Sequence, residues 1–131
     1  MSRGRRQYRP ERMIEMKLKF IEHNEAQEEK TKYERDIYEI GNYRVIRDLS
    51  IYESGGVYES FDVRANRELD YLPDIYFNNR LFGDDFEKEF KIQTTAYGSM
   101  SPDIIQQIIE GYKEAIEVVN ILTDKFLKSE E

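Results

Sequence analysis

The sequence contains no cysteine, only one histidine and no long apolar run. Without cysteine, a disulfide framework, a thiolate zinc site and a cysteine nucleophile are excluded. His23 has no serine or cysteine partner in a recognisable motif, so we expect a surface residue there. No apolar stretch approaches the roughly twenty residues that a membrane span needs, and no secretory segment follows the start. We therefore expect an intracellular, cytoplasmic protein, and no cofactor is indicated because the glycines form neither a GxGxxG pattern nor a Walker loop.

Positive and negative charges are separated along the chain. The first twelve residues contain five arginines and one glutamate, whereas the rest of the chain contains 15 basic and 26 acidic side chains. We interpret residues 1–10 as a flexible Arg-rich arm and residues 11–131 as a single folded domain. An arm of this kind suits phosphate or an acidic surface. An acidic body repels nucleic acid and suits a basic partner.

The first half of the domain is expected to change from helix to strand at Gly41. Residues from Glu11 to about Asp36 are strong helix formers, and apolar residues recur among them at spacings of three and four. This pattern predicts a long N-terminal helix. Residues 43–53 and 57–65 alternate apolar and polar side chains on either side of a glycine turn, which predicts a β-hairpin. The expected register sets Leu49 opposite Phe61.

The second half is expected to add two strands and a helix. A short strand is predicted at residues 74–77, a turn through Asn78, Asn79 and Gly83, and a last strand at about residues 87–97. Ser101-Pro102-Asp103 has the residues of a helix start, and a wide apolar stripe follows it. The predicted fold class is α+β, with a long N-terminal helix, an antiparallel sheet of about four strands, and a long C-terminal amphipathic helix packed on the sheet.

One short pattern has the residues of an enzyme motif. Pro73-Asp74, followed by Glu89-Phe90-Lys91, resembles the PD-(D/E)xK pattern of metal-dependent nucleases. The resemblance implies that Asp74 and Glu89 hold a divalent ion while Lys91 positions the attacking water. The alternative is a solvated strand face, because acidic-x-Lys triplets are common in a chain with 36% charged residues. We favour this alternative and predict a protein without a catalytic residue.

Two clusters of acidic residues are candidates for a surface that binds a basic partner. Carboxylates on a folded surface can imitate DNA phosphates and speed association with a basic channel. The run at Asp84 also offers oxygen ligands for a hard cation, but it lacks the spacing of an EF-hand loop. Three tyrosines, Tyr52, Tyr58 and Tyr76, are candidate aromatic anchors. The acidic candidates are Glu22, Glu25, Glu28, Glu29, Asp84, Asp85, Glu87 and Glu89.

The N-terminal arm resembles the arginine-rich segments that follow nucleic-acid backbones. Guanidinium groups grip phosphates, and a tyrosine can stack on a base. Contact with an acidic protein surface and a passive terminus are the alternatives. The candidate contact residues are Arg3, Arg5, Arg6, Arg9, Arg12 and Tyr8.

The general character of the chain resembles that of small accessory proteins from phages and mobile elements, among them anti-CRISPR proteins. The resemblance covers the whole chain, from the Ser2-Arg3-Gly4-Arg5-Arg6 arm to the Ser101-Pro102-Asp103 helix start, and involves no diagnostic motif. It implies a non-catalytic inhibitor or regulator that binds a basic nucleic-acid-binding protein. The alternative hypothesis is a direct nucleic-acid binder or a small metal-dependent nuclease. Self-association through the first helix is a third.

Overall fold

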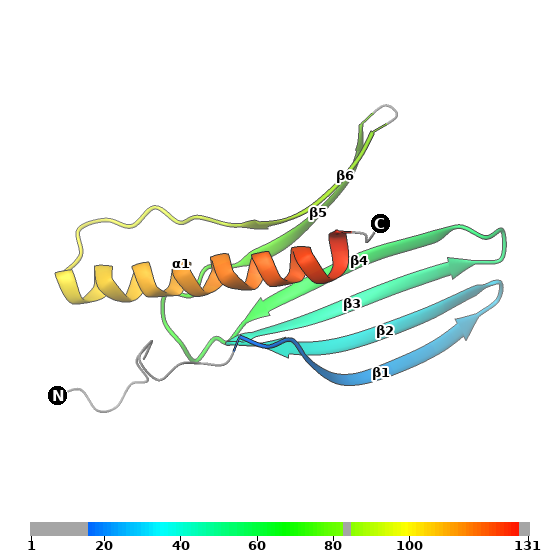
Figure 1. Cartoon of the computed structure of the whole chain (residues 1–131), viewed down its shortest axis with the longest axis horizontal. Helices are drawn as coiled ribbons and strands as arrows, with labels where there is room; N and C mark the ends of the chain where they lie inside the picture. Colours follow the sequence, from blue (N-terminus) through cyan, green and yellow to red (C-terminus); the bar gives the residue numbers. More distant parts are fainter. Residues whose placement is uncertain (1–15, 83–84, 129–131) are drawn as a thin grey trace.

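Six strands and one long helix make up the computed structural model, which describes residues 16–82 and 85–128. Strands β1 (Lys19–Glu28), β2 (Thr31–Ile40), β3 (Tyr43–Tyr52) and β4 (Val57–Ala65) form an antiparallel sheet in chain order. Strands β5 (Ile75–Phe82) and β6 (Asp85–Ile92) form a separate hairpin. Helix α1 (Pro102–Leu122) ends in a π-helical turn at Thr123–Leu127. In Figure 1, α1 runs along one end of the long sheet, whose other end extends past it.

The predicted N-terminal helix is wrong. Within the described part of residues 11–36 the chain forms β1 and most of β2, which pair antiparallel with a β-bulge between Phe20 and Glu22. Glutamate and lysine favour a helix in isolation, but tertiary pairing overrides a weak local preference. Tyr33, Ile37 and Ile40 in β2 pair with Ser50, Ile46 and Tyr43 in β3, so the segment gains a full strand partner. All ten residues of β1 are exposed.

The predicted hairpin at residues 43–65 is present as β3 and β4, with its register shifted. Leu49 lies opposite Glu59, and Phe61 lies opposite Arg47, two residues from the expected pairing. Because side chains alternate with a period of two, this shift leaves every side chain on its expected face. Val45, expected opposite Ala65, lies opposite Val63, and all three side chains are buried.

Strand β5 is longer than predicted, and β6 begins and ends earlier than predicted. The two strands form a separate two-stranded sheet, so the predicted single sheet that joins them to β3 and β4 is wrong. Asn78 and Asn79 lie within β5 rather than in a turn, because they pair with Glu89 and Lys88 of β6. β6 stops at Ile92, so the predicted continuation to residue 97 is wrong. The base of this hairpin packs on β4 through aromatic rings. Phe61 contacts both Phe77 and Phe90, with ring centroids 4.8 and 5.1 Å apart.

Helix α1 begins where the sequence predicts. The Ser101 side chain accepts a hydrogen bond from the backbone N–H of Ile104 at 3.3 Å, and Pro102 occupies the first helical position. Of the apolar stripe that the sequence predicts, Ala115 and Leu122 are buried, whereas Ile105, Ile109 and Ile116 are exposed. The buried residues of α1 are Gly111, Glu114, Ala115, Val118 and Leu122.

Two close contacts fix the position of α1 on the sheet. A methyl group added at Gly111 would lie 2.4 Å from the carbonyl oxygen of Tyr71, so the helix approaches this loop too closely for any side chain. One turn further along, Glu114 is 1% exposed and its carboxylate accepts hydrogen bonds from the backbone N–H and side-chain amide of Asn42, at 2.6 and 3.0 Å. Burial raises the pKa of Glu114, and the bonds from Asn42 oppose that shift.

The core lies between α1 and one end of the four-stranded sheet. The sheet face that carries Tyr43, Val45 and Val63 packs against α1 and is called the inner face here; the opposite face is called the outer face. Tyr43 is buried and its hydroxyl donates to the carbonyl oxygen of Pro73 at 2.6 Å, so this polar group is satisfied. Near the β1–β2 and β3–β4 turns, the sheet extends past the helix (Figure 1).

Candidate functional site

The outer face of the sheet contains a groove of about 610 Å³ near its far end. Strand register creates it. Ala26, Tyr33, Ser50 and Tyr58 are opposite one another on successive strands, so they form one row across the sheet. Small side chains at Ala26 and Ser50 make a low floor beside two tyrosine rings. The next row is Asn24, Arg35, Asp48 and Ser60.

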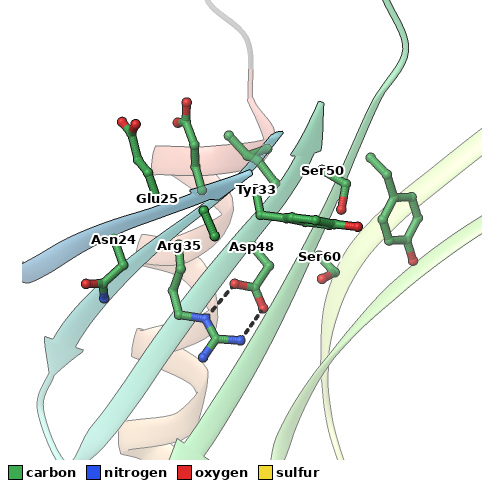
Figure 2. Close-up of a pocket in the computed structure, with 11 residues that line it drawn as sticks. Asn24, Glu25, Tyr33, Arg35, Asp48, Ser50 and Ser60 are labelled. Atoms are coloured by element: carbon green, nitrogen blue, oxygen red, sulfur yellow. Dashed lines mark hydrogen bonds and ion pairs between the residues drawn. The ribbon is translucent and has the colours of Figure 1, made fainter. Parts of the chain in front are cut away.

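An ion pair closes the polar side of this outer-face groove. The Arg35 guanidinium donates to both carboxylate oxygens of Asp48, at 2.7 and 3.0 Å, as Figure 2 shows. A bidentate pair of this kind fixes both side chains more firmly than a single contact. Tyr33 and Tyr58 are 38% and 51% exposed, so their rings remain accessible to a ligand. The groove thus offers two aromatic surfaces, two serine hydroxyls and a fixed ionic edge.

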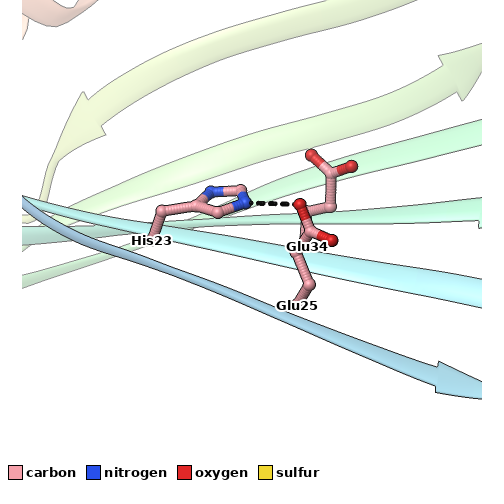
Figure 3. A group of neighbouring side chains, drawn as sticks. All are labelled: His23, Glu25 and Glu34. Atoms are coloured by element: carbon pink, nitrogen blue, oxygen red, sulfur yellow. Dashed lines mark hydrogen bonds and ion pairs between the residues drawn. The ribbon is translucent and has the colours of Figure 1, made fainter.

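On the inner face, at the same end of the sheet, β1 and β2 carry a cluster of titratable groups. His23 lies opposite Asp36 and Glu25 lies opposite Glu34. The imidazole of His23 contacts Asp36 through Nδ1 at 2.5 Å and Glu25 through Nε2 at 2.9 Å. Figure 3 shows the ring of His23 directed toward the two glutamates. The hydrogen bond to Glu25, and then that to Asp36, raise the pKa of His23, while the same contact with His23 lowers the pKa of Glu25.

This cluster continues across the inner face as a chain of ion pairs. Arg47 lies between Asp36, at 3.7 Å, and Glu59, at 2.6 Å, and its guanidinium stands 5.5 Å from the Phe126 ring centroid. Glu59 also contacts Lys88 of β6 at 3.6 Å. The Arg47 contacts therefore link the β1–β2 pair to the end of α1 and to the second hairpin. The polar network begins where the helix stops covering the sheet.

The four predicted N-terminal carboxylates lie on this β1–β2 hairpin and not on a helix. All four are exposed. Strand alternation divides them, because Glu25 is on the inner face while Glu22 and Glu28 are on the outer face. Glu29 occupies the turn with a φ of 51°. A ligand that approaches one face of the sheet thus meets only some of these carboxylates.

The second acidic group is only partly described by the structure. Asp84 lies outside the described residues, whereas Asp85 and Glu87 begin β6. Glu89 is half-buried and contacts Lys91 at 3.1 Å. The arm residues Arg3, Arg5, Arg6, Arg9, Arg12 and Tyr8 also lie outside the described residues.

The residues of the nuclease-like pattern share one face of the β5–β6 hairpin but do not converge. Asp74 precedes β5 and adjoins Gln93, while Glu89 pairs with Asn78, four residues further along the strand. Four residues of strand separate the two carboxylates by roughly 13 Å, which is too far for both to ligate one ion. The Asp74 carboxylate instead accepts a hydrogen bond from Arg67 at 3.0 Å.

Sequence reasoning found some of these features and missed others. The candidate aromatic anchors Tyr52, Tyr58 and Tyr76 are 44%, 51% and 45% exposed, and Tyr58 lines the groove. Tyr33 and Arg35 were missed as groove residues because they were assigned to a helix. The available signal was the set of β-favouring residues Tyr33, Ile37, Tyr38 and Ile40 within and after a run of helix formers.

Comparisons of the chain with protein-family models, with curated proteins and with solved structures found no significant match. In the described residues, no helix has both the length and the apolar character needed to cross a membrane.

Proposed function

We propose that this chain is a non-catalytic interaction protein whose outer-face groove binds a basic segment of a nucleic-acid-binding protein. The observation that carries the proposal is the groove between Tyr33 and Tyr58, which is open and floored by small side chains. Aromatic faces attract Lys and Arg side chains through cation–π contact, and tyrosine is frequent among residues that dominate binding energy.

Charge complementarity favours a basic occupant over an acidic or apolar one. Residues 19–40, which form β1 and β2, contain seven carboxylates and four Lys or Arg side chains. Asp48 lines the groove, and Glu25 and Glu34 border it although their side chains lie on the inner face. This excess of negative charge repels nucleic acid and speeds the approach of a basic chain. In the same proposal, the protein is an inhibitor from a phage or mobile element that acts inside a bacterial cell. This part of the proposal rests on the resemblance in general character to such proteins.

A peptide titration tests the groove. An arginine-rich peptide is added to the full chain and binding is followed by NMR or calorimetry, with an uncharged peptide of equal length as reference. We expect saturable binding of the basic peptide, and Tyr58→Ala should weaken it about tenfold through loss of an aromatic contact. Tyr76→Ala is the matched control, because Tyr76 is similarly exposed and lies on β5, outside the groove.

The outcomes of this titration separate the hypotheses. An equal loss in Tyr58→Ala and Tyr76→Ala, or no difference between the two peptides, would contradict binding in the groove. The alternative, a nucleic-acid binder or nuclease, predicts a gel shift with RNA or DNA and Mg²⁺-dependent cleavage. Cleavage that disappears in Asp74→Ala and in Glu89→Ala would replace our proposal with that alternative.

A further inference from the structure

The pairing of β1 with β2 places two glutamates directly opposite each other on the inner face. Glu25 and Glu34 are cross-strand partners, and like charges at such positions destabilise a sheet. The amino group of Lys32 offsets this repulsion, because it lies 3.7 Å from Glu25 and 3.3 Å from Glu34. The pair of carboxylates therefore already holds one cationic group between its side chains.

His23 completes a set of three ligand groups. One ligand atom each from His23, Glu25 and Glu34 lies within 4.8 Å of the other two. Ligand distances of about 2.0–2.2 Å to a metal place neighbouring ligand atoms a little over 3 Å apart. The side chains of Glu25, which is exposed, and Glu34, which is partly buried, can bring their ligand atoms from within 4.8 Å to this separation by rotating about their own bonds. The set combines one imidazole nitrogen with two carboxylate groups, which suits a first-row divalent ion.

Asp36 supplies a second, independent observation. Histidines that ligate metals usually donate the other ring nitrogen to a carboxylate, which fixes the ring and its tautomer. Asp36 contacts Nδ1 of His23 in this way. The Nε2 atom is left directed at the glutamates, and its contact with Glu25 is drawn in Figure 3. Asp36 is itself held near Arg47, at 3.7 Å, and its side chain is only 17% exposed. Asp36, itself held near Arg47, therefore fixes the orientation of the His23 ring.

We propose that His23, Glu25 and Glu34 form a binding site for a divalent transition-metal ion such as Zn²⁺. The ion takes the place of the Lys32 amino group between the two glutamates and bonds to Nε2 of His23, with solvent or a partner residue in its remaining positions. Asp36 is the positioning residue. The site bridges β1 and β2, so the ion would fasten the exposed edge strand to the sheet.

Calorimetric titration of the full chain with ZnCl₂ tests this site. We expect saturable binding of one ion per chain. His23→Ala should weaken the affinity by at least about tenfold, and Asp36→Asn by about tenfold, as for other positioning residues. The control is Glu22→Gln, which removes an exposed carboxylate from the outer face of the same strand and should bind Zn²⁺ like the wild type.

The Lys32→Ala variant distinguishes loss of the metal site from loss of the fold. Removal of the competing amino group should tighten Zn²⁺ binding several-fold, a change that unfolding cannot produce. Weaker binding in Lys32→Ala would contradict a shared position for the ion and the amino group. The absence of saturable binding, or equal affinity in the wild type, His23→Ala and Glu22→Gln, would overturn the proposal.

Discussion

The two ends of the sheet's inner face differ although the same four strands build both. At one end, Val45 and Val63 are buried under α1, and at the other, Val57 is 61% exposed. The row of Asp36, Arg47 and Phe61 marks the change, because Arg47 meets both a carboxylate and the ring of Phe126. The length of the helix therefore decides which part of the sheet is core and which part is free for a ligand.

The largest expected difference between the two ends is in the free energy of unfolding that is lost when an apolar side chain is removed. Leu122 is fully buried, so Leu122→Ala should lower the free energy of unfolding by about 2–5 kcal/mol. Val57→Ala, at the uncovered end, should change it by less than about 0.5 kcal/mol. Urea denaturation measures both. Equal losses would mean that the uncovered end is part of the core.

A smaller effect is expected where α1 meets the loop before β5. Gly111→Ala would bring a methyl group against the carbonyl oxygen of Tyr71, and the strain should cost about 1–3 kcal/mol. Gly98→Ala is the control, because among the described residues no atom beyond its two chain neighbours lies within 4 Å of the added methyl group. Thermal unfolding followed by circular dichroism compares the two. Full stability in Gly111→Ala would show that the helix can move away from the loop without loss.

The smallest expected effect is a change in the pH dependence of stability. Burial raises the pKa of Glu114, so the unfolded chain releases this proton at a lower pH than the folded chain. The stabilising contribution of Glu114 is complete below the ordinary glutamate pKa and declines as the pH rises through the raised one. Glu114→Gln should remove this decline. Urea denaturation over that pH interval measures it.

The control for this prediction is Glu28→Gln, an exposed carboxylate on β1. It should keep the decline with pH that the wild type shows. An unchanged decline in Glu114→Gln would assign the pH dependence to other groups.

Local signals in the sequence predicted part of the fold well. The helix start at Ser101 and the alternation in β3 and β4 depend on neighbouring residues alone. The register of that hairpin was missed by two residues because an even shift keeps the same side chains on the core face. Ile105, Ile109 and Ile116 were assigned to the buried stripe, but the contact at Gly111 sets the orientation of the helix, and that contact involves a distant loop.

The candidate sites could not be predicted because they depend on the pairing of β1 with β2. His23 is exposed, as predicted, but in the predicted helix it would lie about 20 Å from Asp36, so the contact between them was not expected. In the hairpin they are opposite each other and in contact. The outer-face groove likewise needs four strands in register, since Tyr33 and Tyr58 are brought together across Ser50.

The bulge in β1 has a consequence for aggregation. β1 is the edge strand of its sheet, and unpaired backbone groups on such an edge invite other chains to add further strands. The irregularity between Phe20 and Glu22 interrupts an even ladder, and the exposed glutamates of β1 repel a second copy of the same edge. We expect the bulge and the negative charge together to hinder the stacking of this exposed strand into fibrils.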